Sequence, residues 1–277
     1  MSDRRDLWRA GALWLALTAI GEYVVLNWPL MSPGMSAQAE EVDFAFNLLM
    51  IYSVPVFTFV VTALVYSIAK WRVKGVEPDG DAPPIADHAG FSWGWFIVST
   101  ALAALIFFYP GLTGLLALAE EGQPDLVVEL EAVQWHWNVS FPEYGVTLDN
   151  ARELVLPVDH TIKFELTSRD VIHAFWVPAF RMKQDAIPGE VTEVYVTPTE
   201  EGTFGTDSEL RLQCAELCGT GHARMYVPIR VVSAEEFEAW IAEAGGSGGM
   251  DMGHDEGMDM GGDEMDGNDS MDMEEEG

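Results

Sequence analysis

The chain has 277 residues and is strongly acidic, because 45 Asp and Glu residues stand against 14 Lys and Arg residues and give a formal net charge of −31. A negative field of this strength repels phosphate groups, which excludes nucleic acid as a partner. The segment from Asp251 onward holds 12 of the acidic residues, so the other 33 still outnumber the cations and the acidity extends over the whole chain.

This acidity has two interpretations. High salt screens the repulsion among surface carboxylates, since the Debye length falls to about 3 Å at 1 M. Adaptation to high salt therefore points to a halophilic archaeon as the source. The competing interpretation is an acidic docking face for a basic redox partner, and a count of charges does not separate the two.

The first segment, residues 1–43, has three arginines among its first nine residues, followed by an apolar stretch over 10–20 that Glu22 interrupts. The pattern predicts either a retained membrane helix or a signal peptide with a small-residue cleavage site at 37–39. The distance between this site and the apolar stretch favours membrane insertion. Both interpretations keep the cationic start inside the cell.

Residues 44–119 are predicted to form a transmembrane hairpin. The run 44–69 has no charged residue, and as a helix it spans about 39 Å, enough to cross a hydrocarbon core of about 30 Å. A second uncharged run, 89–119, has two tryptophans near its start and Pro110 inside it. Interfacial tryptophan and a tolerated proline are both usual in membrane helices.

The connector between these runs contains Lys70, Arg72 and Lys74. The excess of Lys and Arg in cytoplasmic loops places this connector in the cytoplasm and directs the outer ends of both helices outward. We therefore expect a multi-pass protein of the cell membrane, in contact with lipid, whose following domain is extracytoplasmic.

Residues 120–232 are predicted to form an all-β domain. Short runs with nearly alternating apolar and polar residues are separated by Gly, Pro, Asn and Asp, which is typical of strands. A segment of about 110 residues with such strands suits a Greek-key sandwich or barrel. The predicted strands are 126–133, 162–167, 192–196 and 226–232.

The C-terminal part divides into two predicted segments. Ser233 and Glu236 form a capping box for a short amphipathic helix over 233–245. Residues 246–277 are built mainly from Gly, Met, Asp and Glu and cannot bury enough apolar surface to become ordered. We expect this tail to be a solvated acidic extension; weak Cu(I) collection by its seven methionines is the alternative.

The most specific pattern places Cys214, Cys218, His222 and Met225 within twelve residues, with His173 upstream in an aromatic-rich segment. Thiolate and thioether are soft donors that suit Cu(I). The second thiolate lies four residues from the first and could bridge to a second metal. The pattern therefore indicates a copper site with donors for two ions.

Two other interpretations use fewer of these residues. A disulfide between Cys214 and Cys218 in an exported domain leaves the spacing of the histidines and the methionine unexplained. A zinc site with two cysteines and two histidines leaves Met225 unused.

The loop resembles the binuclear CuA loop of subunit II of the haem-copper oxidases, cytochrome c oxidase in particular, which reads C-x-E-x-C-x3-H-x2-M. Residues 170–178 are similar to the family segment D-V-x-H-x-F-x-V-P, which contains the first histidine ligand. Residues 183–189 are similar to a segment at the interface with subunit I. The resemblance covers residues 44–232 and implies a two-helix membrane hairpin followed by a cupredoxin domain.

The resemblance also implies a centre of two copper ions, CuA, and a role for each ligand. One of these residues, Glu216, would contribute its backbone carbonyl and direct its side chain toward a Mg2+ shared with subunit I. The implied ligands are Cys214 and Cys218 as bridging thiolates, His173 and His222 as terminal imidazoles, Met225 as the weak thioether, and Glu216.

The run Gln134 to Trp137 is predicted to lie on a strand, with two tryptophans flanking a histidine. Packing at the membrane interface is one interpretation of this run. The family has a similar motif, Q-W-Y-W, whose first tryptophan is the residue where electrons enter above CuA. The resemblance assigns that role to Trp135, while His136 replaces the family's tyrosine.

The implied function is that of subunit II of a terminal oxidase. An external donor, cytochrome c or a small blue-copper protein, delivers electrons, and the subunit passes them to haem in subunit I for the reduction of O2. Other oxidase subunits complete the complex. The alternatives are the CuA subunit of a nitric oxide reductase and a membrane-anchored copper carrier, although a carrier needs neither Trp135 nor the hairpin.

Overall fold

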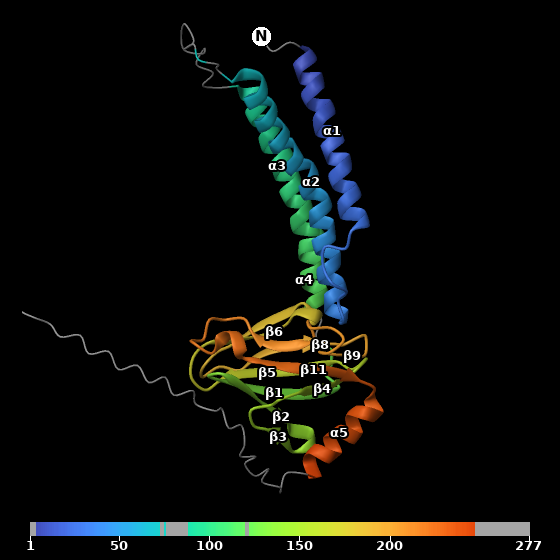
Figure 1. The fold of residues 1–277 in the computed structure, drawn as a ribbon, viewed down its shortest axis with the longest axis vertical. Helices are drawn as coiled ribbons and strands as arrows, with labels where there is room; N and C mark the ends of the chain where they lie inside the picture. The colour runs from blue at the N-terminus through green and yellow to red at the C-terminus, as the bar shows by residue number, and fades with distance from the viewer. Residues whose placement is uncertain (1–3, 73–74, 76–87, 120–121, 247–277) are drawn as a thin grey trace, which may run out of the picture.

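The computed structural model describes residues 4–72, 75, 88–119 and 122–246, and Figure 1 shows a set of long helices with a β domain at one end. Within these residues, three helical segments are long and apolar enough to cross a membrane. The first segment thus adds a third such helix to the predicted hairpin. The helices are α1 (Arg4–Asn27), α2 (Ala37–Trp71) and α3 (Ala89–Ile106), which continues through η1 (Phe107–Leu112) and α4 (Thr113–Leu118).

Helix α2 begins before the predicted start of the hairpin at Phe44. Ser36 caps the helix, because its Oγ accepts a hydrogen bond of 3.0 Å from the Ala39 N–H. The charged first turns therefore extend the helix beyond its apolar run. The small-residue site of the signal-peptide interpretation lies in this first turn, where Ala39 is fully buried.

The second apolar run is interrupted. Tyr109 has an extended backbone (φ −145°, ψ 116°), and the helix resumes beyond Pro110. Proline has no N–H to donate, and its ring disfavours a helical conformation of the residue before it. The prediction of a helical segment long and apolar enough to cross a membrane is confirmed for Ala89–Leu118, which contains a break at Tyr109.

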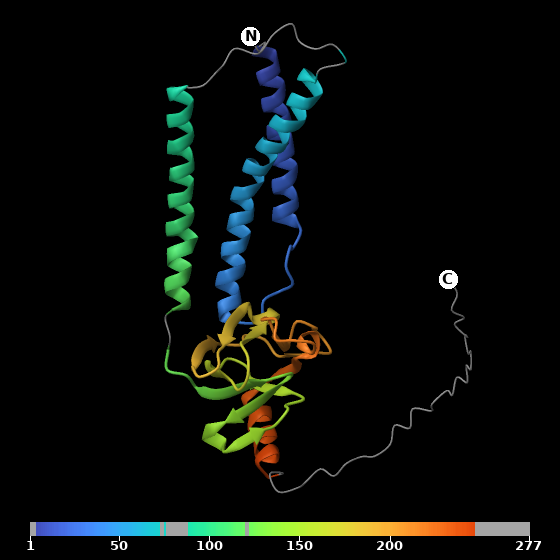
Figure 2. The same cartoon turned by 90° about the vertical axis from the view of Figure 1, so that its left-hand side faces the viewer.

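Helices α1 and α2 pack against each other in antiparallel directions. The Thr18 and Thr58 hydroxyls are 2.7 Å apart, and a Cβ added to Gly21 would lie 2.6 Å from the Val54 side chain. Small residues allow such close approach between membrane helices. Figure 2 shows α1 and α2 crossing, with α3 standing apart from α1.

Two sheets build the β domain, and its buried core lies between them. The predicted strands coincide with β1, β5, β8 and β11, so the prediction of an all-β domain is confirmed. Two pairs, β1 with β5 and β11 with β4, are parallel. One sheet has the order β3 (Val146–Leu148), β2 (His136–Phe141), β1 (Leu126–Val133), β5 (Ile162–Ser168) and β8 (Thr192–Val196). The other has β4 (Leu154–Pro157), β11 (Tyr226–Val232), β10 (Arg211–Cys214), β6 (His173–Val177) and β7 (Met182–Ala186), with β9 (Gly202–Thr203) on β11.

Alternation of side chains places one face of each strand in this core. On β5, Ile162, Phe164 and Leu166 are fully buried while the residues between them are partly exposed. The Phe164 ring meets the Phe175 ring of the opposite sheet with centroids 5.0 Å apart. This aromatic contact joins the two sheets at β6, the strand that carries His173.

Helix α5 (Ala234–Gly246) covers the end of the sandwich far from the membrane helices (Figure 1). Its predicted cap is present, since the Glu236 N–H donates to Ser233 Oγ at 3.3 Å. Phe237 and Ile241 are buried in the core. The predicted tail, residues 246–277, lies outside the described residues except for Gly246.

Candidate metal centre

Two neighbouring strands bring the distant histidine to the cysteine loop. β6 begins with His173 and β10 ends with Cys214, and the two strands pair antiparallel with Cys214 opposite Phe175. His173 Nδ1 consequently lies 3.7 Å from Cys214 Sγ. Sheet pairing therefore closes the gap of 41 residues between these two predicted ligands.

The loop between β10 and β11 supplies the other side chains. Cys218 Sγ lies 3.8 Å from Cys214 Sγ, 3.6 Å from His222 Nδ1 and 3.8 Å from Met225 Sδ. A backbone hydrogen bond of 3.0 Å from the Cys214 N–H to the Met225 carbonyl closes the loop. All five predicted side-chain ligands thus form one cluster: β6 supplies His173, and the loop between the last two strands presents the other four, as the cupredoxin fold predicts.

Four of the five side chains in the cluster are buried, and His222 is partly buried. His173 is 0% exposed, Met225 1%, Cys218 3% and Cys214 7%. Burial, with the neighbouring Cys214 as the second cause, raises the pKa of the Cys218 thiol to about 12. A metal ion must therefore displace thiol protons when it binds, because only the thiolate is a strong ligand.

Glu216 contributes its backbone to the same cluster. Its carbonyl oxygen lies 3.1 Å from Cys214 Sγ, while the residue is exposed to solvent. The structure therefore separates two predicted features of Glu216: the carbonyl is at the cluster, and the carboxylate is at the surface.

Asp170 orients the first histidine. Its Oδ1 lies 2.8 Å from His173 Nε2, so the Nε2–H donates to the carboxylate and the Nδ1 lone pair is free to face the sulfurs. Burial acts to raise the pKa of Asp170, but hydrogen bonds from the Gln134 N–H and from His173 outweigh it and hold the pKa below its usual value. Sequence reasoning missed this role, although Asp170 opens the segment that contains His173.

Gln134 joins the two halves of the cluster. Its backbone N–H donates to Asp170 Oδ2 at 2.7 Å, and its side-chain amide donates to the Cys218 carbonyl at 2.7 Å. Gln134 thereby connects the residue that orients His173 with the loop that carries the cysteines, through its backbone on one side and its side chain on the other.

Trp135 lies in the turn between β1 and β2, and the prediction that places it on a strand is wrong, because the chain reverses direction at Gln134 and Trp135. Its indole Nε1 lies 3.3 Å from the Cys218 carbonyl. The ring covers Gly221 so closely that a Cβ there would lie 2.4 Å from it. Since the residue is also 39% exposed, Trp135 contacts both solvent and the cysteine loop.

The geometry decides between the metal and disulfide interpretations. Both cysteines are free, and 3.8 Å between the sulfurs is far longer than a disulfide bond of about 2.05 Å. Three soft sulfur donors, two imidazoles and a carbonyl exceed the four ligands of a structural zinc site and suit copper. The residues present therefore fit the copper centre better than zinc.

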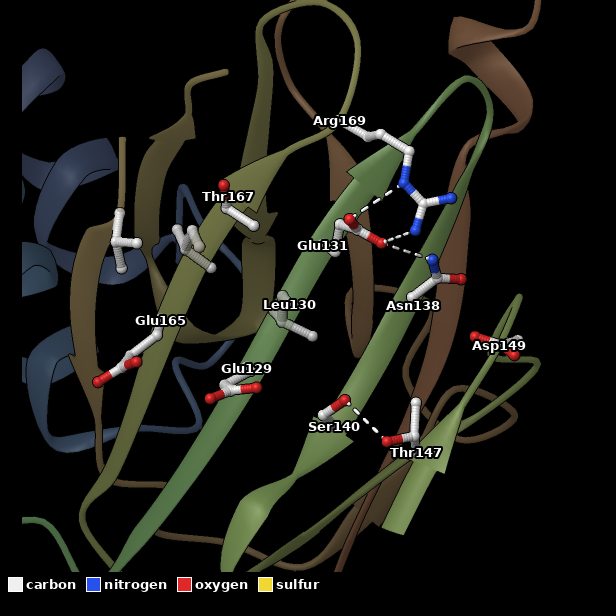
Figure 3. A pocket seen from close by; sticks show the side chains of 12 residues that line it. Glu129, Leu130, Glu131, Asn138, Ser140, Thr147, Asp149, Glu165, Thr167 and Arg169 are labelled. Carbon is white, nitrogen blue, oxygen red and sulfur yellow. Dashed lines mark hydrogen bonds and ion pairs between the residues drawn. The ribbon is translucent and has the colours of Figure 1, made fainter. Parts of the chain in front are cut away.

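A separate groove of about 420 Å3 lies on the outer face of the five-stranded sheet (Figure 3). Glu129, Glu131, Asp149 and Glu165 line it, and an ion pair joins Glu131 to Arg169. None of its twelve lining residues is Cys, His or Met. The acidic surface and the copper donors thus occupy different parts of the β domain.

The comparisons with known proteins point to one family. Residues 146–233 match the family described as cytochrome c oxidase subunit II, periplasmic domain. Over 282 residues the chain is 28% identical to cytochrome c oxidase subunit 2 of Thermostichus vulcanus, covering 82% of each protein. It is 38% identical over 160 residues to the probable cytochrome c oxidase subunit 2 of Streptomyces coelicolor, covering 56% of this chain and 46% of that one.

Among solved structures, the periplasmic domain of cytochrome oxidase subunit II from Bradyrhizobium japonicum is 34% identical with a TM-score of 0.39. That match covers 44% of this chain and 95% of the solved domain.

Proposed function

The chain belongs to the cytochrome c oxidase subunit II family, and from that premise we propose that it accepts electrons from an external donor and passes them to haem in subunit I. It is a membrane protein with a CuA-type copper site in its extramembrane domain. It acts in an oxidase complex with subunit I, where O2 is reduced. The nitric oxide reductase and copper-carrier alternatives are not favoured, because the relatives are oxidase subunits.

The observation that carries the proposal is the buried cluster of soft donors. The chain's own residues bury four of the five side chains of this cluster and hold its geometry through the Asp170 and Gln134 hydrogen bonds. Bound copper would supply the one-electron redox chemistry. We assign the ligands to His173, Cys214, Cys218, His222, Met225 and the carbonyl of Glu216.

We assign the point where electrons enter to Trp135. Its indole contacts the Cys218 carbonyl and remains accessible to a docked donor. Gly221 allows this close stacking because it has no side chain. The donor is a one-electron carrier, cytochrome c or a small blue-copper protein, and the exposed carboxylate of Glu216 is available for the Mg2+ shared with subunit I.

The helices support a location in the cell membrane with an extracytoplasmic copper domain. Arg4, Arg5 and Arg9 begin α1, and Lys70 and Arg72 end α2, at the end of the bundle away from the β domain (Figure 1). Cations of this kind mark the cytoplasmic side. The β domain then lies on the opposite, external side of the membrane.

The first experiment measures copper in the purified full chain. We expect two Cu per chain and an electron paramagnetic resonance (EPR) signal of one unpaired electron shared by both ions. One Cu per chain, or one Zn, would contradict the binuclear assignment.

The second experiment tests Trp135 by stopped-flow reduction of the assembled oxidase. Trp135→Ala should keep the copper content and spectrum, because Trp135 is not a ligand, while slowing reduction by the external donor. Trp240→Ala removes a tryptophan from α5 and should leave that rate unchanged. A wild-type rate in Trp135→Ala would eliminate this role.

A further inference from the structure

The segment between α1 and α2 is built into the β domain. The Met35 N–H donates to the Ala179 carbonyl at 2.8 Å, and the Met35 carbonyl accepts from the Thr199 N–H at 3.1 Å. The Met35 side chain is 7% exposed and belongs to the core between the sheets. The membrane part thus contributes a core residue to the copper domain.

The first residues of α2 continue this attachment. Ser36 Oγ donates to the Phe180 carbonyl at 3.0 Å. The Ala37 N–H donates to the Thr197 carbonyl at 3.0 Å, and Gln38 Oε1 accepts from the Thr197 N–H at 3.0 Å. α2 therefore begins on the surface of the β domain without a flexible linker between them.

Arg181 forms the charged part of the junction. Its guanidinium Nε donates to Asp43 Oδ1 of α2 at 2.8 Å, and its side chain is 10% exposed. The same group donates to the Ser32 carbonyl in the preceding segment. Within the β domain it donates to the Pro178 carbonyl at 2.7 Å and lies 3.5 Å from Glu209.

The backbone of Arg181 is itself unusual. Its φ of 57° and ψ of 13° lie in the left-handed region, which favours glycine. Such a conformation persists at a bulky residue only where the surroundings hold it. The four contacts of the guanidinium supply that restraint, and the planar fork of arginine suits several oxygen acceptors at once.

We call Arg181 with its four partners, Ser32, Asp43, Pro178 and Glu209, the clamp. It connects to the copper cluster through one strand pair, β6 with β7. Arg181 immediately precedes β7, which pairs with β6 from Val177 opposite Met182 to His173 opposite Ala186. The end of this pair nearest the clamp is thereby held to α2, and the other end carries a proposed copper ligand. The direction of α2 therefore sets the orientation of the strand that holds His173.

We propose that Arg181 is a positioning residue that locks the copper domain onto α2 and so fixes the orientation of the copper centre relative to the membrane. This inference rests on the proposed function, because electron transfer to haem in another subunit requires a fixed distance and direction. Arg181 acts through the β6–β7 pair and does not contact the ligands.

The test uses the full chain, loaded with copper and reconstituted in oriented phospholipid membranes. The EPR spectrum of the wild type should change sharply with the angle between the membrane and the field. Arg181→Gly, which relieves the left-handed backbone, should lose this angular dependence while its copper content and its unoriented spectrum stay unchanged. In the assembled oxidase, transfer from copper to haem should slow while reduction by the donor stays normal.

Two further variants make the test specific. Asp43→Ala removes the membrane-helix partner outside the copper domain and should cause the same loss of orientation. Arg230→Gln breaks ion pairs to Glu153 and Glu236 elsewhere in the domain and should behave as the wild type.

Wild-type angular dependence in both Arg181→Gly and Asp43→Ala would overturn the proposal. Loss of copper in Arg181→Gly with normal orientation in Asp43→Ala would also overturn it, because Arg181 would then serve only folding. Absence of the shared-electron signal in the wild type would contradict the proposed function instead.

Discussion

The β domain and the membrane helices are held together by different forces. The β domain buries large side chains such as Trp137, Phe141 and Phe164 completely between its sheets. By contrast, the structure describes all of α3, and none of its residues is buried. Water drives the burial of apolar groups in the first region, whereas lipid tails are as apolar as the helices and give no such force between them.

The helices consequently depend on specific contacts. α1 and α2 meet through paired threonines and through the Trp14 indole, which donates to the Pro55 carbonyl at 2.9 Å. The segment η1, which follows α3, reaches α2 where the Phe44 and Tyr109 rings lie 5.9 Å apart. The surface of α3 itself is left for lipid or for another subunit. We therefore expect substitutions in the copper cluster to have large effects on the copper centre. Substitutions between the helices should have small effects on stability.

The largest effect is expected from Cys218→Ser. Cys218 Sγ contacts another thiol, an imidazole and a thioether, so it is the hub of the cluster. The variant should lose the shared-electron EPR signal entirely and keep its far-UV circular dichroism, because serine fills nearly the same space. Cys214→Ser should behave in the same way. An unchanged absorption spectrum in either variant would refute the bridging role.

A smaller effect is expected from Asp170→Ala. Removal of the carboxylate frees His173 Nε2 and lets the ring turn, which should weaken copper binding about 10- to 100-fold. Competition with a chelator of known affinity measures the loss. Asp170→Asn keeps an acceptor for the Nε2–H and should lose less, whereas equal affinities in all three proteins would show that Asp170 does not orient the ligand.

Met225→Leu should be milder still. The swap conserves volume in a buried position and should lower the free energy of unfolding by less than about 1.5 kcal/mol. The thioether is the weakest expected ligand, so both copper ions should remain while their reduction potential shifts. Redox titration and thermal unfolding measure the two effects. Release of copper from the Met225→Leu variant would show that Met225 binds copper more strongly than proposed.

The smallest effect is expected between the helices. Thr18→Val removes the hydroxyl contact to Thr58, and a polar contact of this kind contributes about 0.6 kcal/mol in membrane proteins. A double-mutant cycle with Thr58→Val, followed by unfolding in detergent, measures the coupling. The copper spectrum should be identical in all variants, and a coupling of zero would show that this contact does not hold α1 to α2.

Local patterns in the sequence determined much of this protein. Alternating residues predicted β1, β5, β8 and β11, because a strand exposes alternate side chains to one face. Uncharged runs predicted the membrane helices, because a charge is costly in lipid. Four of the proposed side-chain ligands lie within one loop, so their spacing alone indicated a copper site.

The tertiary structure decided the features that depend on residues far apart in the chain. The contact of Trp135 with Cys218 spans 83 residues and the ion pair of Arg181 with Asp43 spans 138. No local periodicity carries such pairs, because they follow from which strands become neighbours and where α2 enters the β domain. One short loop in the sequence is therefore enough to predict the copper site, whereas the position of this site relative to solvent and membrane depends on tertiary packing.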